Sequence, residues 1–276
     1  MTSESSSKTW FITGASRGFG HIWAQAALAR GDKVAATARD TSTLGSLAEQ
    51  YGEALLPLSL DVTDRTAAFD AVARAHEHFG ALDVVVNNAG YGLFGTIEEV
   101  SEEQARAQIE TNLFGALWVT QAALPIMRGQ RSGHILQVSS IGGVAAFPTV
   151  GLYHASKWGL EGFSDTLSQE VAHLGIRVTL IEPGPYGTDW SGSSAVRADP
   201  IEDYEPVREA RRQSTASRTQ ADPEATAEAV LKIIDSEDPP LRLFLGSWPL
   251  PIAEKAYAQR LETWRAWNEV AEAAQG

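Results

Sequence analysis

Short apolar segments alternate with helix-like segments along most of the chain, and this alternation limits the possible folds more than any other feature. Segments with helical periodicity include residues 19–31, 65–80 and 102–127. The segments between the helices are apolar or β-branched without strict alternation, which is typical of parallel strands covered on both faces. The pattern predicts an α/β fold in which helices flank a doubly wound parallel sheet of about seven strands. The predicted strands are residues 8–13, 33–38, 54–60, 82–87, 134–139, 177–182 and 241–246.

Residues that commonly begin or end helices support these boundaries. Ser101 and Gln104 form a capping-box pattern, and Asp222 is an expected N-cap followed by a proline. Glycines stand where helix C-caps are expected, at positions 31, 80 and 175. With no low-complexity linker in view, we expect a disordered tail over residues 1–7 and a single domain over 8–276. The aromatic-rich segment 250–274 is predicted to be a C-terminal helix.

Composition excludes several classes of function. The 276 residues carry a formal net charge of −13, which argues against binding to nucleic acid or to anionic membranes. The absence of cysteine excludes disulfides and thiolate chemistry. The polar start of the chain lacks the features of a secretory signal, and no apolar run reaches membrane-spanning length. We therefore expect a soluble cytoplasmic protein without a membrane partner.

A glycine-rich turn, TGASRGFG over residues 13–20, joins the first predicted strand to the first helix. Gly14 permits a tight turn, and Gly18 and Gly20 allow backbone and helix to approach a pyrophosphate at the helix N-terminus. This placement favours dinucleotide binding over a purely structural turn, and Ser16 and Phe19 belong to the predicted site. The fold is therefore expected to be of the Rossmann type.

The end of the second predicted strand indicates which dinucleotide is bound. Enzymes that prefer NAD usually carry an acidic residue here, whereas this chain has Ala38 and Arg39. Arg17 of the glycine turn is expected to point toward the same place. Two guanidinium groups suit a 2′-phosphate, so we predict a preference for NADP(H) over NAD(H). Asp40 is adjacent and partly opposes the effect, and both arginines also fit solvated surface positions.

Tyr153 stands four residues before Lys157. In a helix this spacing spans about 6 Å of rise and places both side chains on one face. A neighbouring ammonium favours the phenolate, so we expect a lowered pKa for Tyr153 and a role in proton transfer. Alone, the spacing also fits a half-buried tyrosine beside a solvated lysine.

Taken together, the motifs resemble the short-chain dehydrogenase/reductase family. They occur in the family's order across about residues 8–190, and Ser140 precedes Tyr153 by the family's usual 13 residues. The motifs are TGASRGFG at 13–20, LDV at 60–62, NNAG at 87–90, NLFG at 112–115, GHILQVSS at 133–140, YHASK at 153–157 and PGPYGT at 183–188.

The resemblance implies a role for each motif residue. Tyr153 is the expected acid/base, Ser140 holds the substrate oxygen, Lys157 binds the nicotinamide ribose, and Asn112 supports a water chain to the lysine. The remaining residues implied to contact the cofactor are Asp61, Val62, Asn88, Ala89, Gly90, Pro183, Gly184, Tyr186 and Thr188. Three aromatic residues depart from the family pattern, namely Phe19, Trp23 and Tyr186, and the last leaves the carboxamide contact open.

The remaining charged and titratable residues give little indication of a functional role. The histidines form no convincing metal site, and we expect no metal. His154 is expected to point away from the catalytic face. Residues 98–103, EEVSEE, are predicted to be a solvated helix start.

Aromatic residues in the expected loops predict where the substrate binds. Phe94, Phe147 and Trp190 are assigned to the pocket, with residues 186–220 as a substrate loop that includes a mobile or short-helical stretch after residue 191. Such a lining favours a fairly apolar carbonyl or alcohol, although it also fits ordinary loop packing. The tail aromatics Trp248, Tyr257, Trp264 and Trp267 either cap this pocket or bury a subunit contact. By resemblance we expect a homo-oligomer, either a dimer or a tetramer.

The sequence thus predicts an NADP(H)-dependent oxidoreductase that interconverts a ketone or aldehyde and an alcohol, with Tyr153 as acid/base. The alternatives are a non-catalytic NADP-binding regulator on the same fold, and an epimerase or dehydratase relative. The retained Ser140, Tyr153 and Lys157 argue against the regulator. The short segment after Thr188 argues against the second alternative, whose members usually carry a longer substrate domain.

Overall fold

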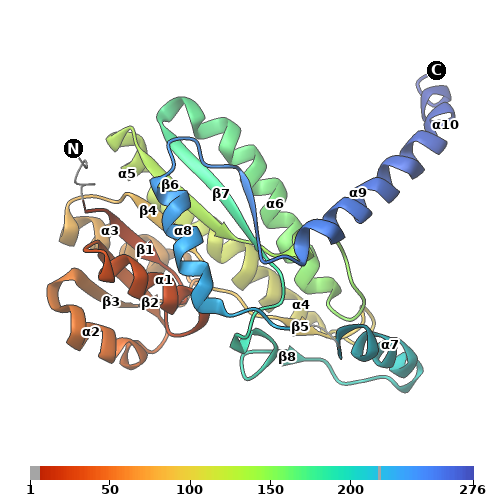
Figure 1. Cartoon of the computed structure of the whole chain (residues 1–276), viewed down its shortest axis with the longest axis horizontal. Coiled ribbons are helices and arrows are strands. Elements are labelled where there is room, and N and C mark those ends of the chain that lie inside the picture. The colour runs from red at the N-terminus through yellow and green to blue at the C-terminus, as the bar shows by residue number, and fades with distance from the viewer. Residues whose placement is uncertain (1–6, 217–218) are drawn as a thin grey trace.

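The computed structural model describes residues 7–216 and 219–276, and its centre is a parallel sheet of seven strands (Figure 1). Their order across the sheet is β3-β2-β1-β4-β6-β7-β9, so the chain winds from β1 to one edge and then from β4 to the other. Doubly wound sheets bind ligands where the winding reverses, which here is between β1 and β4. The strands are β1 (Thr9–Ile12), β2 (Lys33–Ala38), β3 (Leu55–Ser59), β4 (Val84–Asn87), β6 (Gly133–Val138), β7 (Ile176–Pro183) and β9 (Arg242–Leu245).

Helices cover both faces of this sheet, because successive strand residues point to opposite faces. Trp10 and Ile12 of β1 pack with helices α1, α2 and α8, whereas Phe11 packs with α3, α5 and α6. All three residues are fully buried, which explains why the strand is apolar throughout. The covering helices are α1 (Gly18–Ala29), α2 (Gly45–Tyr51), α3 (Arg65–Phe79), α5 (Gly115–Gln130), α6 (Gly151–Val171) and α8 (Thr226–Asp235).

The predicted strands and caps are confirmed. Each of the seven strands lies within two residues of its predicted ends. The Ser101 hydroxyl accepts from the Gln104 N–H while the Gln104 side chain accepts from the Ser101 N–H, which is the expected capping box. Asp222 accepts from the N–H of Glu224 at the start of the segment that leads into α8.

Two long predicted segments are subdivided. The helix expected over residues 102–127 consists of α4 (Glu102–Ile109), one π-helical turn (Glu110–Phe114) and the start of α5. The described part of 191–220, which is 191–216 and 219–220, contains more regular structure than expected. Within it β8 (Val196–Arg197) pairs with β5 (Leu93–Phe94), and α7 (Glu205–Ala216) follows. Two-residue strands have no periodicity that a sequence could reveal.

The expectation that residues 98–103 form a solvated helix start is wrong for Glu99. Its side chain is only 2% exposed and accepts from the backbone N–H groups of Thr96 and Ile201 and from the Arg208 guanidinium. Although burial opposes the change, these donors lower the pKa of Glu99 to about 2. Glu99 therefore fastens the segment that contains Ile201 and α7 to the body of the protein.

The two ends of the chain differ in how they meet the body. The predicted tail falls on residues 1–6, outside the described residues, and on Ser7, whose hydroxyl donates to the Gly31 carbonyl at 2.9 Å. The predicted C-terminal helix is divided into α9 (Pro249–Ala266) and α10 (Asn268–Ala273), which project away from the sheet (Figure 1). Within residues 7–216 and 219–276, no helix is both long and apolar enough to cross a bilayer.

Candidate active site

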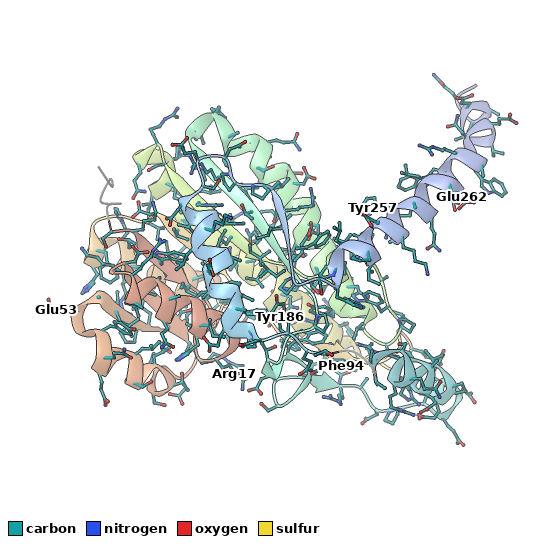
Figure 2. The ribbon with its side chains drawn as sticks, in the orientation of Figure 1. Arg17, Glu53, Phe94, Tyr186, Tyr257 and Glu262 are labelled. Atoms are coloured by element: carbon teal, nitrogen blue, oxygen red, sulfur yellow. The ribbon has the colours of Figure 1, made fainter. Side chains whose placement is uncertain are left out.

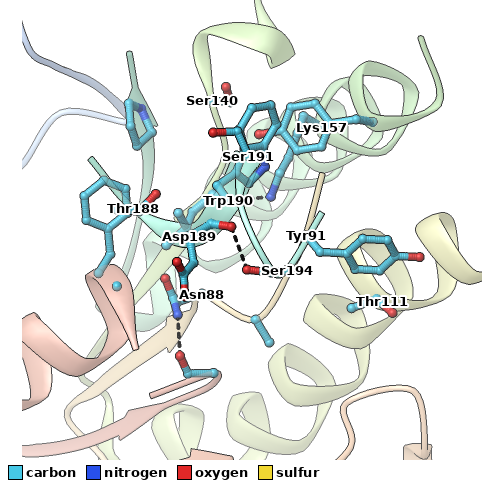
Figure 3. Close-up of a pocket in the computed structure, with 18 of the residues that line it drawn as sticks. Asn88, Tyr91, Thr111, Ser140, Lys157, Thr188, Asp189, Trp190, Ser191 and Ser194 are labelled. Atoms are coloured by element: carbon cyan, nitrogen blue, oxygen red, sulfur yellow. Dashed lines mark hydrogen bonds between the residues drawn. The ribbon is translucent and has the colours of Figure 1, made fainter. Parts of the chain in front are cut away.

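The carboxyl edge of the sheet opens into a cavity of about 760 Å³ (Figure 3). Its wall combines the turn after β1, the ends of β2 and β4, the segments after β6 and β7, and the first turns of α6. The cavity thus lies where the winding of the sheet reverses. Of the residues predicted from the sequence, those at its wall are Gly14, Ser16, Arg17, Gly18, Phe19, Arg39, Asp61, Val62, Asn88, Ala89, Gly90, Ser140, Phe147, Tyr153, Lys157, Pro183, Gly184, Tyr186, Thr188 and Trp190.

Three side chains from neighbouring elements meet in this cavity. Tyr153 and Lys157 lie one helical turn apart on α6, and both are 6% exposed. The Lys157 ammonium donates to the Val138 carbonyl at 2.7 Å and lies 5.8 Å from the centre of the Tyr153 ring. Ser140 follows β6, where its hydroxyl accepts from the Gly142 N–H at 3.0 Å, and it is close enough to the Tyr153 hydroxyl to affect the pKa of that group. The structure therefore brings together the hydroxyl, phenol and ammonium that the sequence proposed.

The expected lowering of the Tyr153 pKa is wrong for the chain by itself. Burial raises the pKa of Tyr153 to about 12, against a smaller lowering by the Ser140 side chain. Burial also lowers the pKa of Lys157 to about 8, although the nearby Glu161 opposes this change. The ammonium is engaged with the Val138 carbonyl and is itself desolvated, so its effect on the phenol does not outweigh burial.

The glycine turn is held by Asn88, which follows β4. Its side-chain amide donates to the carbonyls of Thr13 and Gly14 at 2.9 and 3.0 Å. Gly14 and Gly18 have φ of +64° and +56°, in the left-handed region that favours glycine. A side chain at Gly20 would place its Cβ 2.5 Å from the Asn88 amide nitrogen. The structure thus gives Gly20 a packing role between helix and turn rather than a place at the cavity wall.

The two arginines predicted to recognise a 2′-phosphate both lie at the cavity wall. Arg39 is exposed at the carboxyl end of β2. Arg17 is half exposed and lies 3.4 Å from the Asp189 carboxylate (labelled in Figures 2 and 3, respectively). The carboxylate of Asp40 accepts from the Ser42 N–H, and that of Asp61 from the N–H and hydroxyl of Thr63. Both acids are therefore engaged in their own turns.

The aromatic departures from the family pattern form a single group. Phe19 stacks on Trp23 with ring centres 5.3 Å apart, and Tyr186 meets Phe19 edge-on at 5.2 Å. The Trp23 indole donates to the Thr226 hydroxyl at 2.8 Å. These rings join the glycine turn, α1 and the segment after β7. The three residues that depart from the family pattern therefore pack against one another.

Trp190 dominates the expected substrate side of the cavity. Its ring centre lies 4.9 Å from that of Tyr153 and 5.2 Å from that of Phe94 (Trp190 is labelled in Figure 3). The assignment of Phe94 to the wall is wrong, because Phe94 is not among the wall residues, and its ring packs with Trp190 and with the guanidinium groups of Arg197 and Arg211. Phe147 is at the wall, as expected, with its ring centre 5.9 Å from that of Trp248.

Asn112 also lies behind the wall. It is 2% exposed in the π-helical turn, where it exchanges hydrogen bonds with the Tyr91 backbone and donates to the Ser156 hydroxyl at 3.2 Å. A side chain at Gly90 would place its Cβ 3.0 Å from the Asn112 carbonyl oxygen. Asn112 thus connects the loop after β4 to α6 beside Lys157.

Several wall residues were missed or discounted. His154 is at the wall, contrary to the expectation that it points away, and its Nδ1 accepts from the Phe147 N–H at 3.3 Å. Burial lowers the pKa of His154 to about 4, with a contribution from Arg211. Arg211 of α7 and Tyr91 are also at the wall, and no spacing in the sequence identifies them.

The tail aromatics divide between two places. Trp248 lies at the cavity wall, whereas Tyr257, Trp264 and Trp267 are 49%, 61% and 64% exposed on the projecting helix. Trp248 therefore belongs to the pocket, and the other three do not. In the described part of the chain, no three His, Asp or Glu side chains gather in a way that suits a metal ion.

Comparison with known proteins gives consistent similarities. The family model described as short chain dehydrogenase matches residues 8–197. Oxidoreductase BOA17 of Botryotinia fuckeliana is 43% identical over 95% of this chain and 97% of its own length. A short-chain dehydrogenase from Streptomyces avermitilis superimposes with a TM-score of 0.92 at 35% identity, covering 98% of this chain and 99% of that one. An alcohol dehydrogenase from Thermococcus sibiricus, complexed with 5-hydroxy-NADP, gives a TM-score of 0.74 at 28% identity, covering 88% and 97%.

Proposed function

The chain belongs to the short-chain dehydrogenase family of oxidoreductases, which act on CH–OH and C=O groups, and we propose that it uses NADP(H) to interconvert an apolar ketone or aldehyde and its alcohol. The observation that carries this proposal is the meeting of Ser140, Tyr153 and Lys157 in one cavity with the glycine turn. Such a cavity accommodates a dinucleotide at one end and a small substrate at the other.

The residues present fit the proposed cofactor. The turn around Gly14 and Gly18 adopts backbone conformations that leave the N-terminus of α1 open to a pyrophosphate. Arg17 and Arg39 would hold the 2′-phosphate, and Thr188, at the wall after β7, would hold the carboxamide. The NADP analogue named with the Thermococcus sibiricus structure supports the choice of cofactor.

The side chains then divide the chemistry between them. When bound, the nicotinamide supplies or accepts the hydride. Ser140 and Tyr153 hold the substrate oxygen with their hydroxyls, where negative charge develops during reduction. Tyr153 gives its proton to that oxygen, and Lys157 stabilises the phenolate that remains. A pKa of about 12 keeps Tyr153 protonated near neutral pH, which is the state that reduction requires.

The lining of the cavity supports an apolar substrate. The rings of Trp190 and Phe147 form its outer wall, and the Trp190 ring covers one side of Tyr153. A carbonyl group reaching the Ser140 and Tyr153 hydroxyls would place its substituents against these rings. We assign the described part of the predicted substrate loop, residues 186–216 and 219–220, to this side of the site; residues 217 and 218 lie outside the described residues.

The test is turnover. Oxidation of NADPH, followed by its absorbance with a panel of ketones and aldehydes, should be rapid for apolar members and nearly abolished in Tyr153→Phe. Tyr257→Phe, which removes a hydroxyl from an exposed position on helix α9, should leave turnover unchanged. Tight NADPH binding without turnover on a broad panel would instead favour the non-catalytic regulator, and equal activity of both variants would refute the role of Tyr153.

A further inference from the structure

Helices α9 and α10 form an arm, residues 249–273, that leaves the body of the protein (Figures 1 and 2). In α9 only Pro249 and Ala253, at its beginning, are buried, and α10 has no buried residue. Near the middle of the arm, the Arg260 guanidinium lies 4.5 Å from the centre of the Trp158 ring on α6. Helices in proteins gain most of their stability from packing, so an arm of this kind needs a partner.

Large apolar side chains form a stripe along the arm. Their spacings of seven, four and three residues bring them to one side of a helix. Each is at least 43% exposed, and isolated exposed residues are ordinary whereas a contiguous row marks a binding surface. This arm stripe consists of Leu250, Tyr257, Leu261, Trp264 and Trp267.

The charges on the arm favour one kind of partner. In the inner half, Lys255 and Arg260 outnumber Glu254, whereas in the outer half Glu262, Glu269 and Glu272 outnumber Arg265. An antiparallel copy of the arm would set each half against one of opposite charge, and would also oppose the two helix dipoles. An anionic membrane is disfavoured, because the arm has no basic cluster and the chain carries a net charge of −13.

We propose that the arm stripe binds the same stripe of a second copy of this chain in antiparallel orientation. The contact is isologous, since the same surface is used on both copies, and it closes as a two-fold dimer. Tyr257 and the tryptophans supply the apolar contact area, and aromatic residues of this kind are enriched where protein interfaces are strongest.

The test compares native masses by light scattering and by sedimentation. Trp264→Glu should halve the native mass of the wild-type protein, because it places a carboxylate in the stripe. Gln259→Glu, which adds the same charge on the opposite side of the helix, should not. A wild-type monomer at all concentrations, or an unchanged mass in Trp264→Glu, would overturn the proposal. So would a monomer that binds phosphatidylcholine/phosphatidylserine vesicles through the stripe.

A second observation concerns the buried carboxyl groups behind the active site. Along α6, Glu161 follows Lys157 by one further turn and faces Glu182 of β7. Arg242 of β9 donates to Glu161 at 3.0 Å and to Asp165 at 2.9 Å, and its Nε lies 3.8 Å from Glu182. Glu182 is 0% exposed. The three carboxyls thus surround one guanidinium.

The charges in this cluster do not balance if every carboxyl is ionised. Arg242 and Lys157 supply two positive charges against three negative ones from Glu161, Asp165 and Glu182. With both glutamates ionised, neither oxygen of Glu182 has a hydrogen-bond donor, since Glu161 can then only accept. A buried carboxylate without donors is costly, and one proton between the two carboxyls removes both problems.

Resting on the proposed function, we infer that Glu182 is protonated and donates to Glu161, which stays ionised as the counter-ion of Lys157. Glu161 is then a positioning residue, because it acts on the reaction only through the lysine. The electrostatics agree with this arrangement. Burial and the neighbouring Glu161 raise the pKa of Glu182 to about 9, and Glu161 opposes the lowering of the Lys157 pKa that burial causes.

Two measurements test the pair separately. Loss of the Glu161 charge makes the Lys157 cation less favourable, so in Glu161→Gln the basic limb of the kcat/KM profile should move to lower pH. Asp165→Asn, which changes the exposed partner of Arg242, should leave that limb in place. An unmoved limb in Glu161→Gln would remove Glu161 from this role.

The protonation of Glu182 is tested without turnover. A carboxyl with its pKa raised from 4.5 to about 9 contributes stability that falls as pH rises between these values. Unfolding in urea should therefore show wild-type stability declining across this range more steeply than that of Glu182→Gln. Equal slopes would overturn the assignment, and they would do so even if the chain turned over no carbonyl substrate.

Discussion

Replacing Arg39 with alanine should reduce the preference for NADPH over NADH. Arg39 lies exposed at the carboxyl end of β2, at the wall of the cavity, where a 2′-phosphate is expected. A hydrogen bond between charged groups contributes about 1.5–3 kcal/mol. At an exposed position the lower end applies, since two unit charges 4 Å apart in water interact by only about 1 kcal/mol.

These values bracket the expected effect. A loss of about 1–1.5 kcal/mol corresponds to about a 5- to 13-fold fall in kcat/KM for NADPH, with NADH little changed. The effect should shrink at high salt, because the contact is exposed to solvent. Arg17 should contribute less than Arg39, since its guanidinium already lies 3.4 Å from Asp189.

The assay is steady-state kinetics with both cofactors and one good carbonyl substrate. Lys33→Ala is the matched control, because Lys33 is an exposed cation on the same strand but at its opposite, amino end. It should leave the ratio of the two kcat/KM values unchanged. An unchanged ratio in Arg39→Ala, or an equal shift in both variants, would refute the reasoning.

Three further outcomes follow from packing and protonation. Gly20→Ala would place a Cβ 2.5 Å from the Asn88 amide nitrogen, so it should lower the free energy of unfolding in urea by about 1–3 kcal/mol and weaken cofactor binding. The control is Gly45→Ala, whose Cβ would have no atom within 4 Å, and it should change neither quantity. Asp32→Ala leaves the buried Trp10 indole N–H without its acceptor and removes the ion pair with Arg30 at 2.6 Å, so it should lower the free energy of unfolding by about 3–5 kcal/mol. The control Asp235→Ala, which removes an exposed partner of Arg30, should lower it by under about 1 kcal/mol. Equal losses would contradict this prediction. Burial lowers the pKa of His134 from 6.5 to about 3, so neutral His134 contributes stability above pH 6.5 that is lost as the pH falls toward 3. Thermal unfolding at several pH values should therefore show that the stability of His134→Gln declines less on acidification than that of the wild type. Parallel declines would contradict this prediction.

The sheet could be predicted because its signal is local. A strand buried on both faces must be apolar along its whole length, as Trp10, Phe11 and Ile12 are. The pairing of Tyr153 with Lys157 could also be predicted from the sequence, because a spacing of four residues on a long helix places both side chains on one face. The direction of the Tyr153 pKa could not, because it depends on how deeply the phenol is buried, and that is set by residues far along the chain.

The substrate side of the cavity could be predicted least from the sequence, because its shape also depends on residues far apart along the chain. Its wall depends on where the segment after β7 lies, and that segment is fastened by Glu99, which binds Arg208 across 109 residues of sequence. In the sequence Glu99 stands among acidic neighbours that favour a solvated helix start, so its buried role was hidden. In this arrangement the Trp190 ring lies against Tyr153, Arg211 is at the wall, and Phe94 is not. We therefore expect Glu99, although it does not line the cavity, to influence which substrates bind, because it helps to place residues that do.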